Sequence, residues 1–115
     1  LFTYQLDRCC RTAGTDTIAV AAHPGYSATH LQRHSGVFSF LNTFLAQPPQ
    51  MGVLPLLYAA TAEEVQGGEF FGPDGFLEMR GYPKKVRSSA VSYDSALAKR
   101  LWEVSRKVTG IQYAF

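Results

Sequence analysis

The stretch from Thr17 to Thr29 constrains the fold of this chain more than any other. Residues 18–22 (Ile-Ala-Val-Ala-Ala) form an uninterrupted apolar run with β-branched side chains, which is typical of a strand covered on both faces. Pro24 and Gly25 then end the run, because proline removes a ladder donor and glycine permits a turn and a close backbone approach. We therefore predict a buried strand whose carboxyl end leads into a ligand-facing turn, as in open parallel sheets.

A helix is predicted before this strand, over residues 1–12. Its apolar positions recur at helical spacing, and they are Phe2, Leu6 and Cys9 or Cys10. Asp7 and the neighbouring arginines fall on the opposite side, which we expect to face solvent. Gly14 supplies the glycine that commonly follows the end of a helix.

The middle of the chain carries both helix and strand signals. Residues 28–33 predict a short helix, and the aromatic segment 36–45 fits either a core helix, which we favour, or a lid over an apolar substrate pocket. Residues 51–61 predict a further helix with Pro55 in its first turn, where no intrahelical donor is missed. Residues 69–73 are predicted as a short strand.

The last third of the chain begins with a segment without periodicity, residues 74–92, which we predict to be a surface loop with some fixed turns. A final helix is predicted over residues 93–108, with Ser92 or Asp94 as its cap and Gly110 as its stop. The apolar residues that mark one face of this helix are Leu97, Leu101, Trp102, Val104 and Val108.

The predicted elements indicate an α/β fold. The helix over residues 51–61 joins the strand at 18–22 to the strand at 69–73, as in a right-handed parallel βαβ unit. Two strands are too few for a stable sheet, because the apolar first strand would keep an exposed edge that pairs with another chain or aggregates. We therefore expect a parallel sheet that is incomplete on its own and is completed by a partner chain or by strand exchange.

Composition excludes several classes of function. A formal net charge of +2 is too small to indicate nucleic-acid binding, and the basic run at 84–87 is predicted to be a solvated loop. Cys9 and Cys10 are adjacent, a spacing that fits neither a redox pair nor a zinc knuckle, so we expect free thiols in a reducing compartment. Neither a membrane span nor a targeting segment is recognisable in the 115 residues, and we expect a cytoplasmic protein.

Two further groups of polar residues are candidates for sites. His30 and His34 share one helical face, but no carboxylate or cysteine accompanies them, which favours exposed polar residues over a zinc site. Paired carboxylates are expected to be solvated charges in both cases, Asp94 with Glu103 and Glu63 with Glu64.

Four ordered motifs give the chain a family resemblance. They are His-Pro-Gly-x-x-x-Thr at 23–29, Leu-Tyr-Ala-Ala-Thr at 57–61, Gly-Gly-Glu-Phe-Phe-Gly-Pro at 67–73 and Leu-Trp-Glu-Val-Ser at 101–105. In this order they resemble the C-terminal part of a short-chain dehydrogenase/reductase, in the branch that holds retinol dehydrogenase-like, WW-domain oxidoreductase-like and protochlorophyllide reductase-like proteins. The resemblance covers residues 1–115 as one C-terminal segment and implies that the N-terminal dinucleotide-binding half is absent from this sequence.

The resemblance implies a Rossmann-type sheet, an NAD or NADP cofactor and hydride transfer on an apolar alcohol or ketone in the complete enzyme. The residues it assigns to the nicotinamide end of the cofactor are Pro24, Gly25, Tyr26 and Thr29. An apolar substrate pocket would be lined by Phe38, Phe40, Leu41 and Phe44. Simpler interpretations stay open, in which Gly25 only makes a turn and Thr29 only caps a helix.

No catalytic residue can be assigned by the same resemblance. In the 115 residues no tyrosine is followed four places later by lysine, and there is no Gly-x-x-x-Gly-x-Gly turn for a pyrophosphate. We therefore expect this chain alone to bind no dinucleotide tightly and to be inactive. The alternatives are an autonomous, non-catalytic dimerising or binding module, acting as a homo-oligomer, and a remnant whose other half is missing.

Overall fold

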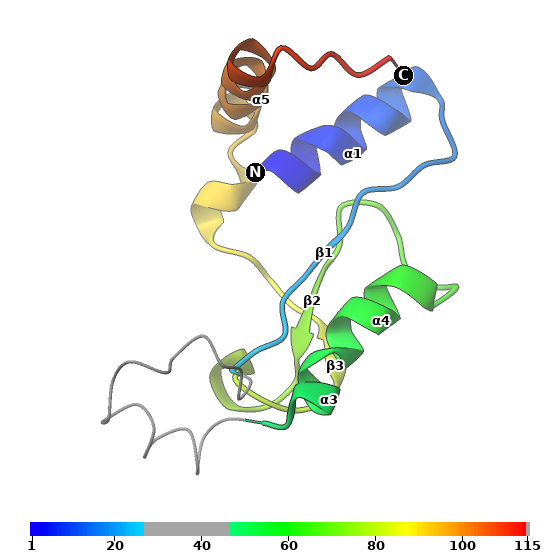
Figure 1. The fold of residues 1–115 in the computed structure, drawn as a ribbon, viewed down its shortest axis with the longest axis vertical. Helices are drawn as coiled ribbons and strands as arrows, with labels where there is room; N and C mark the ends of the chain where they lie inside the picture. The colour runs from blue at the N-terminus through cyan, green and yellow to red at the C-terminus, as the bar shows by residue number, and fades with distance from the viewer. Residues whose placement is uncertain (27–46, 115) are drawn as a thin grey trace. The chain divides into compact units, whose positions relative to one another are not determined.

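The structure is a computed structural model that describes residues 1–26 and 47–114 (Figure 1). The helices predicted over residues 28–33 and 36–45 therefore lie outside the described residues. The chain divides into two compact units. The first consists of Leu1–Ala21, Val65–Glu69 and Arg87–Phe115, and the second of Ala22–Glu64 and Phe70–Val86.

The first unit begins with helix α1 (Phe2–Ala13), which confirms the predicted N-terminal helix. Gly14 ends it in the left-handed conformation, with φ of 69°, and donates its backbone N–H to the Arg11 carbonyl. Asp7 corrects the prediction for the polar side of this helix, because its side chain is fully buried rather than solvent-facing. Helical periodicity could not reveal this, since the cover comes from the Gly67 loop, where an added Cβ would overlap the Asp7 carboxylate.

Helix α5 (Ser95–Thr109) confirms the predicted final helix. Asp94, one of the two predicted caps, accepts hydrogen bonds from the N–H groups of Ala96 (2.8 Å) and Leu97 (3.0 Å), and Gly110 ends the helix with φ of 71°. These local signals lie next to the helix in sequence, which is why they are readable without the fold.

Helices α1 and α5 pack on each other within the first unit (Figure 1). Trp102 is buried, and its ring lies 5.0 Å from that of Phe2, while Ala98 and Cys10 complete the small core. The predicted apolar face of α5 is otherwise exposed, by 39–79% at Leu97, Leu101, Val104 and Val108. The face is therefore apolar as predicted, but of its five predicted residues only Trp102 is buried in the described part of the chain.

The sheet has three strands, and β2 lies between the other two. The strands are β1 (Ala21–Ala22), β2 (Phe70–Pro73) and β3 (Pro83–Lys85). Strand β2 confirms the prediction for residues 69–73, whereas β1 is shorter than the apolar run that predicted it. Ile18 is 48% exposed, so the described residues do not bury the whole run, and its burial inside a larger sheet stays a prediction. Ahead of β1, the Ala19 N–H donates to the Asp7 carboxylate, and the Ala19 carbonyl accepts the Gly68 N–H.

Strand pairing makes the sheet mixed. The N–H groups of Ala21 and His23 donate to the carbonyls of Glu69 and Phe71, so the bonds advance in the same direction along both strands and the pairing is parallel. Strand β3 pairs with β2 antiparallel, with Phe71 opposite Lys85. The predicted parallel pair is confirmed, and β3 adds an antiparallel strand that the prediction of a parallel sheet did not include.

Two helices belong to the second unit, α3 (Pro49–Gly52) and α4 (Leu54–Thr61). Pro55 lies in the first turn of α4 and is buried, as the missing N–H of proline allows there. Leu56 and Leu57 are 44% and 50% exposed, so this short helix also keeps apolar surface uncovered.

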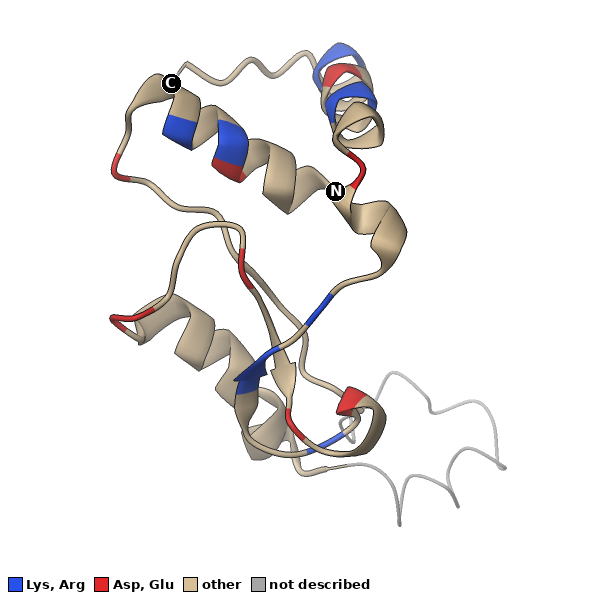
Figure 2. Ribbon diagram, turned by 180° about the vertical axis from the view of Figure 1, so that it is seen from behind, with Lys and Arg blue, Asp and Glu red and all other residues tan. Residues whose placement is uncertain are grey.

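Residues 74–92 hold more regular structure than the loop predicted for them. An irregular turn forms over Phe76–Glu78, a short 3₁₀ helix forms over Ala90–Tyr93, and β3 lies between them. Lys84 and Lys85 are exposed as predicted, but they belong to β3 rather than to a loop (Figure 2). A three-residue strand that begins with proline has too little alternation to be recognised from sequence.

Candidate functional site

The carboxyl end of β1 leads into the Pro-Gly turn, defined here as Pro24, Gly25 and Tyr26. Gly25 has φ of 66°, which disfavours any residue with a Cβ. The space around it is also closed, because an added Cβ would lie 2.5 Å from the Met79 carbonyl oxygen and 2.6 Å from Cγ of Pro73. The turn is therefore a close approach between two loops, and not only a change of direction.

Hydrogen bonds within the second unit fix the peptide groups of this turn. The Gly25 N–H donates to Nδ1 of His23 (3.3 Å), and the Tyr26 N–H donates to the Met79 carbonyl (2.6 Å). On the other side, Nε2 of Gln47 donates to the Pro24 carbonyl (2.8 Å), and the Gln47 N–H donates to the Tyr26 carbonyl (2.9 Å). Among the described residues, the Gly25 carbonyl is the main-chain group of the turn for which no such bond is found.

Gln47 is the buried polar residue that joins the turn to the loop after β2. Only 4% of its surface is exposed, and its Oε1 accepts the Gly81 N–H at 3.0 Å. Both ends of its amide are therefore satisfied, as a buried amide requires. Beside it lies a pocket of about 340 Å³, lined by Gln47, Pro48, Met51, Arg80 and Gly81.

His23, the residue before the turn, pairs with Glu78. Its Nε2 lies 3.0 Å from Oε2 of Glu78, and its ring centroid lies 5.2 Å from that of Phe70. The ring rests against Gly72, where an added Cβ would overlap Nε2. His23 is thus held between β2 and the loop that follows it.

The loop that carries Glu78 is strained. Leu77 and Glu78 have φ of 51° and 55°, a left-handed conformation that non-glycine residues seldom adopt. Phe76 and Leu77 are also 77% and 74% exposed, so two large apolar side chains project from the same loop. Strain of this kind persists where surrounding contacts determine it, and it concentrates at functional sites.

The structure brings together three of the predicted cofactor-site residues, Pro24, Gly25 and Tyr26. The fourth, Thr29, lies outside the described residues, as do His30, His34 and the predicted pocket residues Phe38, Phe40, Leu41 and Phe44. Sequence reasoning missed Gln47, which stands out only as the residue before two prolines, and Glu78, which no local pattern marks.

The carboxylates weighed as pairs serve separate local roles. Asp94 caps α5, and Oε1 of Glu64 accepts a hydrogen bond from the Tyr58 hydroxyl at 2.5 Å. This bond lowers the pKa of Glu64 below its usual value, because it stabilises the charged form. Within residues 1–26 and 47–114 no group of three side chains could hold a metal ion.

The first unit has its own aromatic contacts. Tyr4 and Tyr93 stack with ring centroids 5.2 Å apart, and the Tyr4 hydroxyl lies 2.8 Å from Oγ of Ser88. Burial raises the pKa of Tyr4, whereas the hydrogen bond with Ser88 lowers the pKa of Tyr93. These tyrosines join α1 to the segment before α5.

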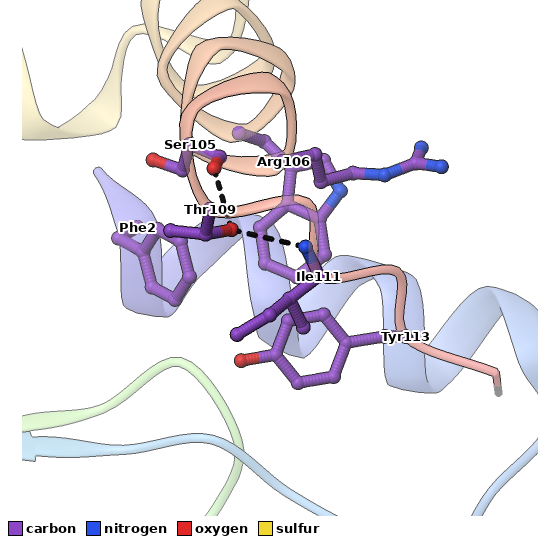
Figure 3. A pocket seen from close by; sticks show the side chains of 7 residues that line it. Phe2, Ser105, Arg106, Thr109, Ile111 and Tyr113 are labelled. Carbon is purple, nitrogen blue, oxygen red and sulfur yellow. Dashed lines mark hydrogen bonds between the residues drawn. The ribbon is translucent and has the colours of Figure 1, made fainter.

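A small pocket of about 190 Å³ lies beside α5 (Figure 3). Its walls are mostly apolar, with Trp102 stacked on Tyr113 at 5.2 Å, and Oγ1 of Thr109 accepts the Ile111 N–H at its rim. Figure 3 shows the charged end of Arg106 pointing away from the pocket. It therefore offers little chemistry beyond apolar contact.

Neither unit, in the part of the chain that is described, contains a helix long and apolar enough to cross a bilayer. Both cysteines are free thiols, as predicted.

Comparison with known proteins supplies relatives for this arrangement. No protein-family model matches the chain. It is similar to retinol dehydrogenase 13 of Homo sapiens, at 31% identity over 97% of this chain and 34% of the relative. It is likewise similar to polyprenol dehydrogenase of Mus musculus (30% identity, 96% of this chain, 32% of the relative) and to a short-chain dehydrogenase/reductase of Aspergillus calidoustus (29%, 90% and 34%).

A crystal structure of an uncharacterised protein from Mycobacterium paratuberculosis has the same fold over this segment. The TM-score is 0.75 at 30% identity, and the match covers 99% of this chain and 36% of that one. The chain spans about a third of the length of the curated relatives it matches.

Proposed function

We propose that this chain forms the nicotinamide end of a cofactor site. It is a distant homologue of NAD(P)-dependent short-chain dehydrogenases/reductases and matches about a third of their length. The Pro-Gly turn would be the wall that meets the nicotinamide carboxamide, with the Thr29 hydroxyl nearby. The complete enzyme would transfer a hydride between NAD or NADP and an apolar alcohol or ketone.

The observation that carries this proposal is the fixed shape of the turn. Both of its N–H groups donate within the chain, while the Gly25 carbonyl is left as an acceptor among the described residues. A carboxamide NH₂ is a neutral donor, and a fixed, uncharged carbonyl suits it without loss of preorganisation. A nicotinamide amide would meet this requirement, and the bound cofactor would supply the hydride.

The pyrophosphate does not fit this chain. The sequence has no glycine-rich turn at the start of a helix, so the residues that would hold two phosphates must come from elsewhere. It also has no tyrosine paired with a lysine four residues later for proton transfer. The role proposed here is therefore binding and orientation, and the 115 residues alone are expected to show no turnover.

An apolar substrate is supported by two observations. Relatives carry the names retinol dehydrogenase and polyprenol dehydrogenase, and both alcohols are apolar. In this chain, Phe76 and Leu77 project from the loop that also carries Glu78, the partner of His23 beside the turn. They join Phe38, Phe40, Leu41 and Phe44 as residues proposed to contact such a substrate.

A chimera tests the proposal. In human retinol dehydrogenase 13, the segment that aligns with this chain would be replaced by these 115 residues. We expect the purified chimera to bind a nicotinamide dinucleotide and to oxidise an apolar alcohol, followed by the absorbance of the reduced cofactor. Gly25→Ala should abolish both, whereas Gly14→Ala should preserve both. A folded chimera that binds no dinucleotide would refute the proposal.

A second candidate is a non-catalytic dimerising module, and one observation favours it. Large apolar side chains on α4 and α5 are exposed, among them Leu57 at 50% and Val108 at 79%. Apolar surface of this kind commonly marks an interface. Analytical ultracentrifugation of the 115-residue chain separates the two ideas, because a monomer at all concentrations would exclude the dimer.

A further inference from the structure

His23 is enclosed on four sides by groups from different parts of the second unit. Gly72 lies against Nε2 so closely that no Cβ fits there, and the Phe70 ring packs at 5.2 Å. The carboxylate of Glu78 lies at Nε2, and the Gly25 N–H points at Nδ1. Although the side chain of His23 is 31% exposed, each ring nitrogen has a partner within the chain.

The two partners determine which nitrogen carries the proton. A backbone N–H only donates, so Nδ1 must present its lone pair to Gly25. A carboxylate only accepts, so Nε2 must carry the hydrogen that faces Glu78. The arrangement is satisfied by the neutral imidazole with its proton on Nε2, and by no other form of the ring.

This tautomer has a consequence for the peptide group between Pro24 and Gly25. Its N–H is held by His23, and its carbonyl is held from the opposite side by Nε2 of Gln47 at 2.8 Å. A peptide is planar, so two opposed anchors fix its rotation. The Gly25 carbonyl belongs to the next peptide group, whose N–H, that of Tyr26, donates to the Met79 carbonyl at 2.6 Å. Both peptide planes that meet at Gly25 are therefore held.

We propose that His23, kept in its Nε2–H tautomer by Glu78, is a positioning residue that fixes the Pro24–Gly25 peptide group. Together with Met79, which holds the next peptide group, it thereby aims the Gly25 carbonyl at the ligand. The aiming of a cofactor rests on the function proposed above, whereas the tautomer and the held peptide are properties of the chain without ligand. A failure of dinucleotide binding would therefore refute the aiming of a cofactor but leave the tautomer and the held peptide standing.

The strained loop supports the assignment independently. Glu78 adopts φ of 55° and Leu77 φ of 51°, and this conformation directs the Glu78 side chain to His23 while the Glu78 and Met79 carbonyls close on Gly25. Glycine adopts this conformation without the steric cost that a Cβ brings, so leucine and glutamate are strained at these positions. The strain is located at the residue that sets the tautomer.

Nuclear magnetic resonance of the ¹⁵N-labelled 115-residue chain tests the proposal without any ligand. At about pH 8, where an ordinary imidazole is neutral, two-bond ¹⁵N–¹H spectra should show His23 with its proton on Nε2. In Glu78→Ala the two tautomers should mix, and hydrogen exchange of the Gly25 amide should become about tenfold faster. Glu78→Gln, which keeps an acceptor oxygen, should restore both signatures.

Glu63→Ala is the matched control, because Glu63 is an exposed carboxylate of the same unit, in the turn that follows α4. It should change neither the tautomer nor the exchange of Gly25. A wild-type His23 protonated on Nδ1 would overturn the inference, and so would a Glu78→Ala chain in which both signatures are unchanged. If Glu78→Ala fails to fold, the wild-type tautomer and the Glu78→Gln spectrum decide the question.

Discussion

The Pro-Gly turn and helix α5 differ in where their shape comes from. In the turn, four main-chain groups have partners within the second unit, and Gly25 is closed in by Met79 and Pro73. In α5, which has 15 residues, only Ala98 and Trp102 are buried, while its leucines and valines are exposed by 39–79%. Contacts within the chain thus determine the turn fully, whereas α5 is a helix by its own sequence and keeps an apolar face for something else to cover.

The largest effect expected from this comparison concerns glycines. Gly25→Ala should lower the free energy of unfolding of the second unit by about 4 kcal/mol, because left-handed strain and overpacking add. Gly14→Ala, at nearly the same φ but with nothing within 4 Å of the new Cβ, should cost the first unit about 1 kcal/mol. Urea unfolding with unit-resolved amide exchange measures both. Equal losses would remove the distinction between a packed turn and an open one.

Next in size is the core of the helical region. Trp102→Ala should lower the free energy of unfolding of the first unit by about 3 kcal/mol, because the ring is buried against Phe2. Val108→Ala, on the 79% exposed side, should change it by less than about 0.5 kcal/mol. Thermal unfolding of the two variants provides the comparison. A large loss at Val108 would show that its face is covered in solution, by a second copy of the chain.

A smaller effect tests whether α5 depends on local signals. Asp94→Ala removes the cap that accepts from Ala96 and Leu97, and should lower the stability of α5 by about 1 kcal/mol. Amide exchange should accelerate in α5 and stay unchanged at Tyr26 in the turn. Glu103→Ala, an exposed position in the same helix, serves as the control. Faster exchange at Tyr26 would mean that the two regions are coupled.

The smallest effect concerns an exposed carboxylate of the second unit. Tyr58→Phe removes the hydrogen bond to Glu64, so the pKa of Glu64 should rise back toward its ordinary value. Because this pKa is depressed in the folded chain, the bond stabilises the fold above the unfolded pKa of Glu64, and that contribution is lost as pH falls through the folded pKa. A ¹³C carboxyl titration with Glu63 as internal reference measures the shift. No change in Glu64 would contradict the assigned cause.

The sequence predicted the parts of the fold whose signals are local. The caps at Gly14, Asp94 and Gly110 lie beside α1 and α5, and both helices were found where expected. The single helix predicted over residues 51–61 is instead divided into α3 and α4, with Pro55 in the first turn of α4. Strand β3 was missed because three residues carry no usable alternation. Asp7 was placed on the wrong side because the loop that buries it is distant in sequence.

The candidate site was predicted in the same uneven way. Proline and glycine predicted the turn, because the fixed φ of proline and the conformational freedom of glycine follow from the residue type. Gln47 and Glu78 were missed because their partners are distant in sequence. Gln47 bonds to Pro24, 23 positions away, and Glu78 bonds to His23, 55 positions away. Side chains that hold a turn from a distance leave no periodic trace in the sequence.

The central claim is that the Pro-Gly turn is the nicotinamide-facing wall of a cofactor site. The most direct test is a titration of the ¹⁵N-labelled chain with nicotinamide mononucleotide, which carries the amide but needs no dinucleotide cradle. The account predicts weak, saturable shifts of the amide signals of Gly25, Tyr26, Gln47 and Gly81, with α5 unaffected. Shifts confined to α5, or no shift in the turn at any concentration, would contradict it.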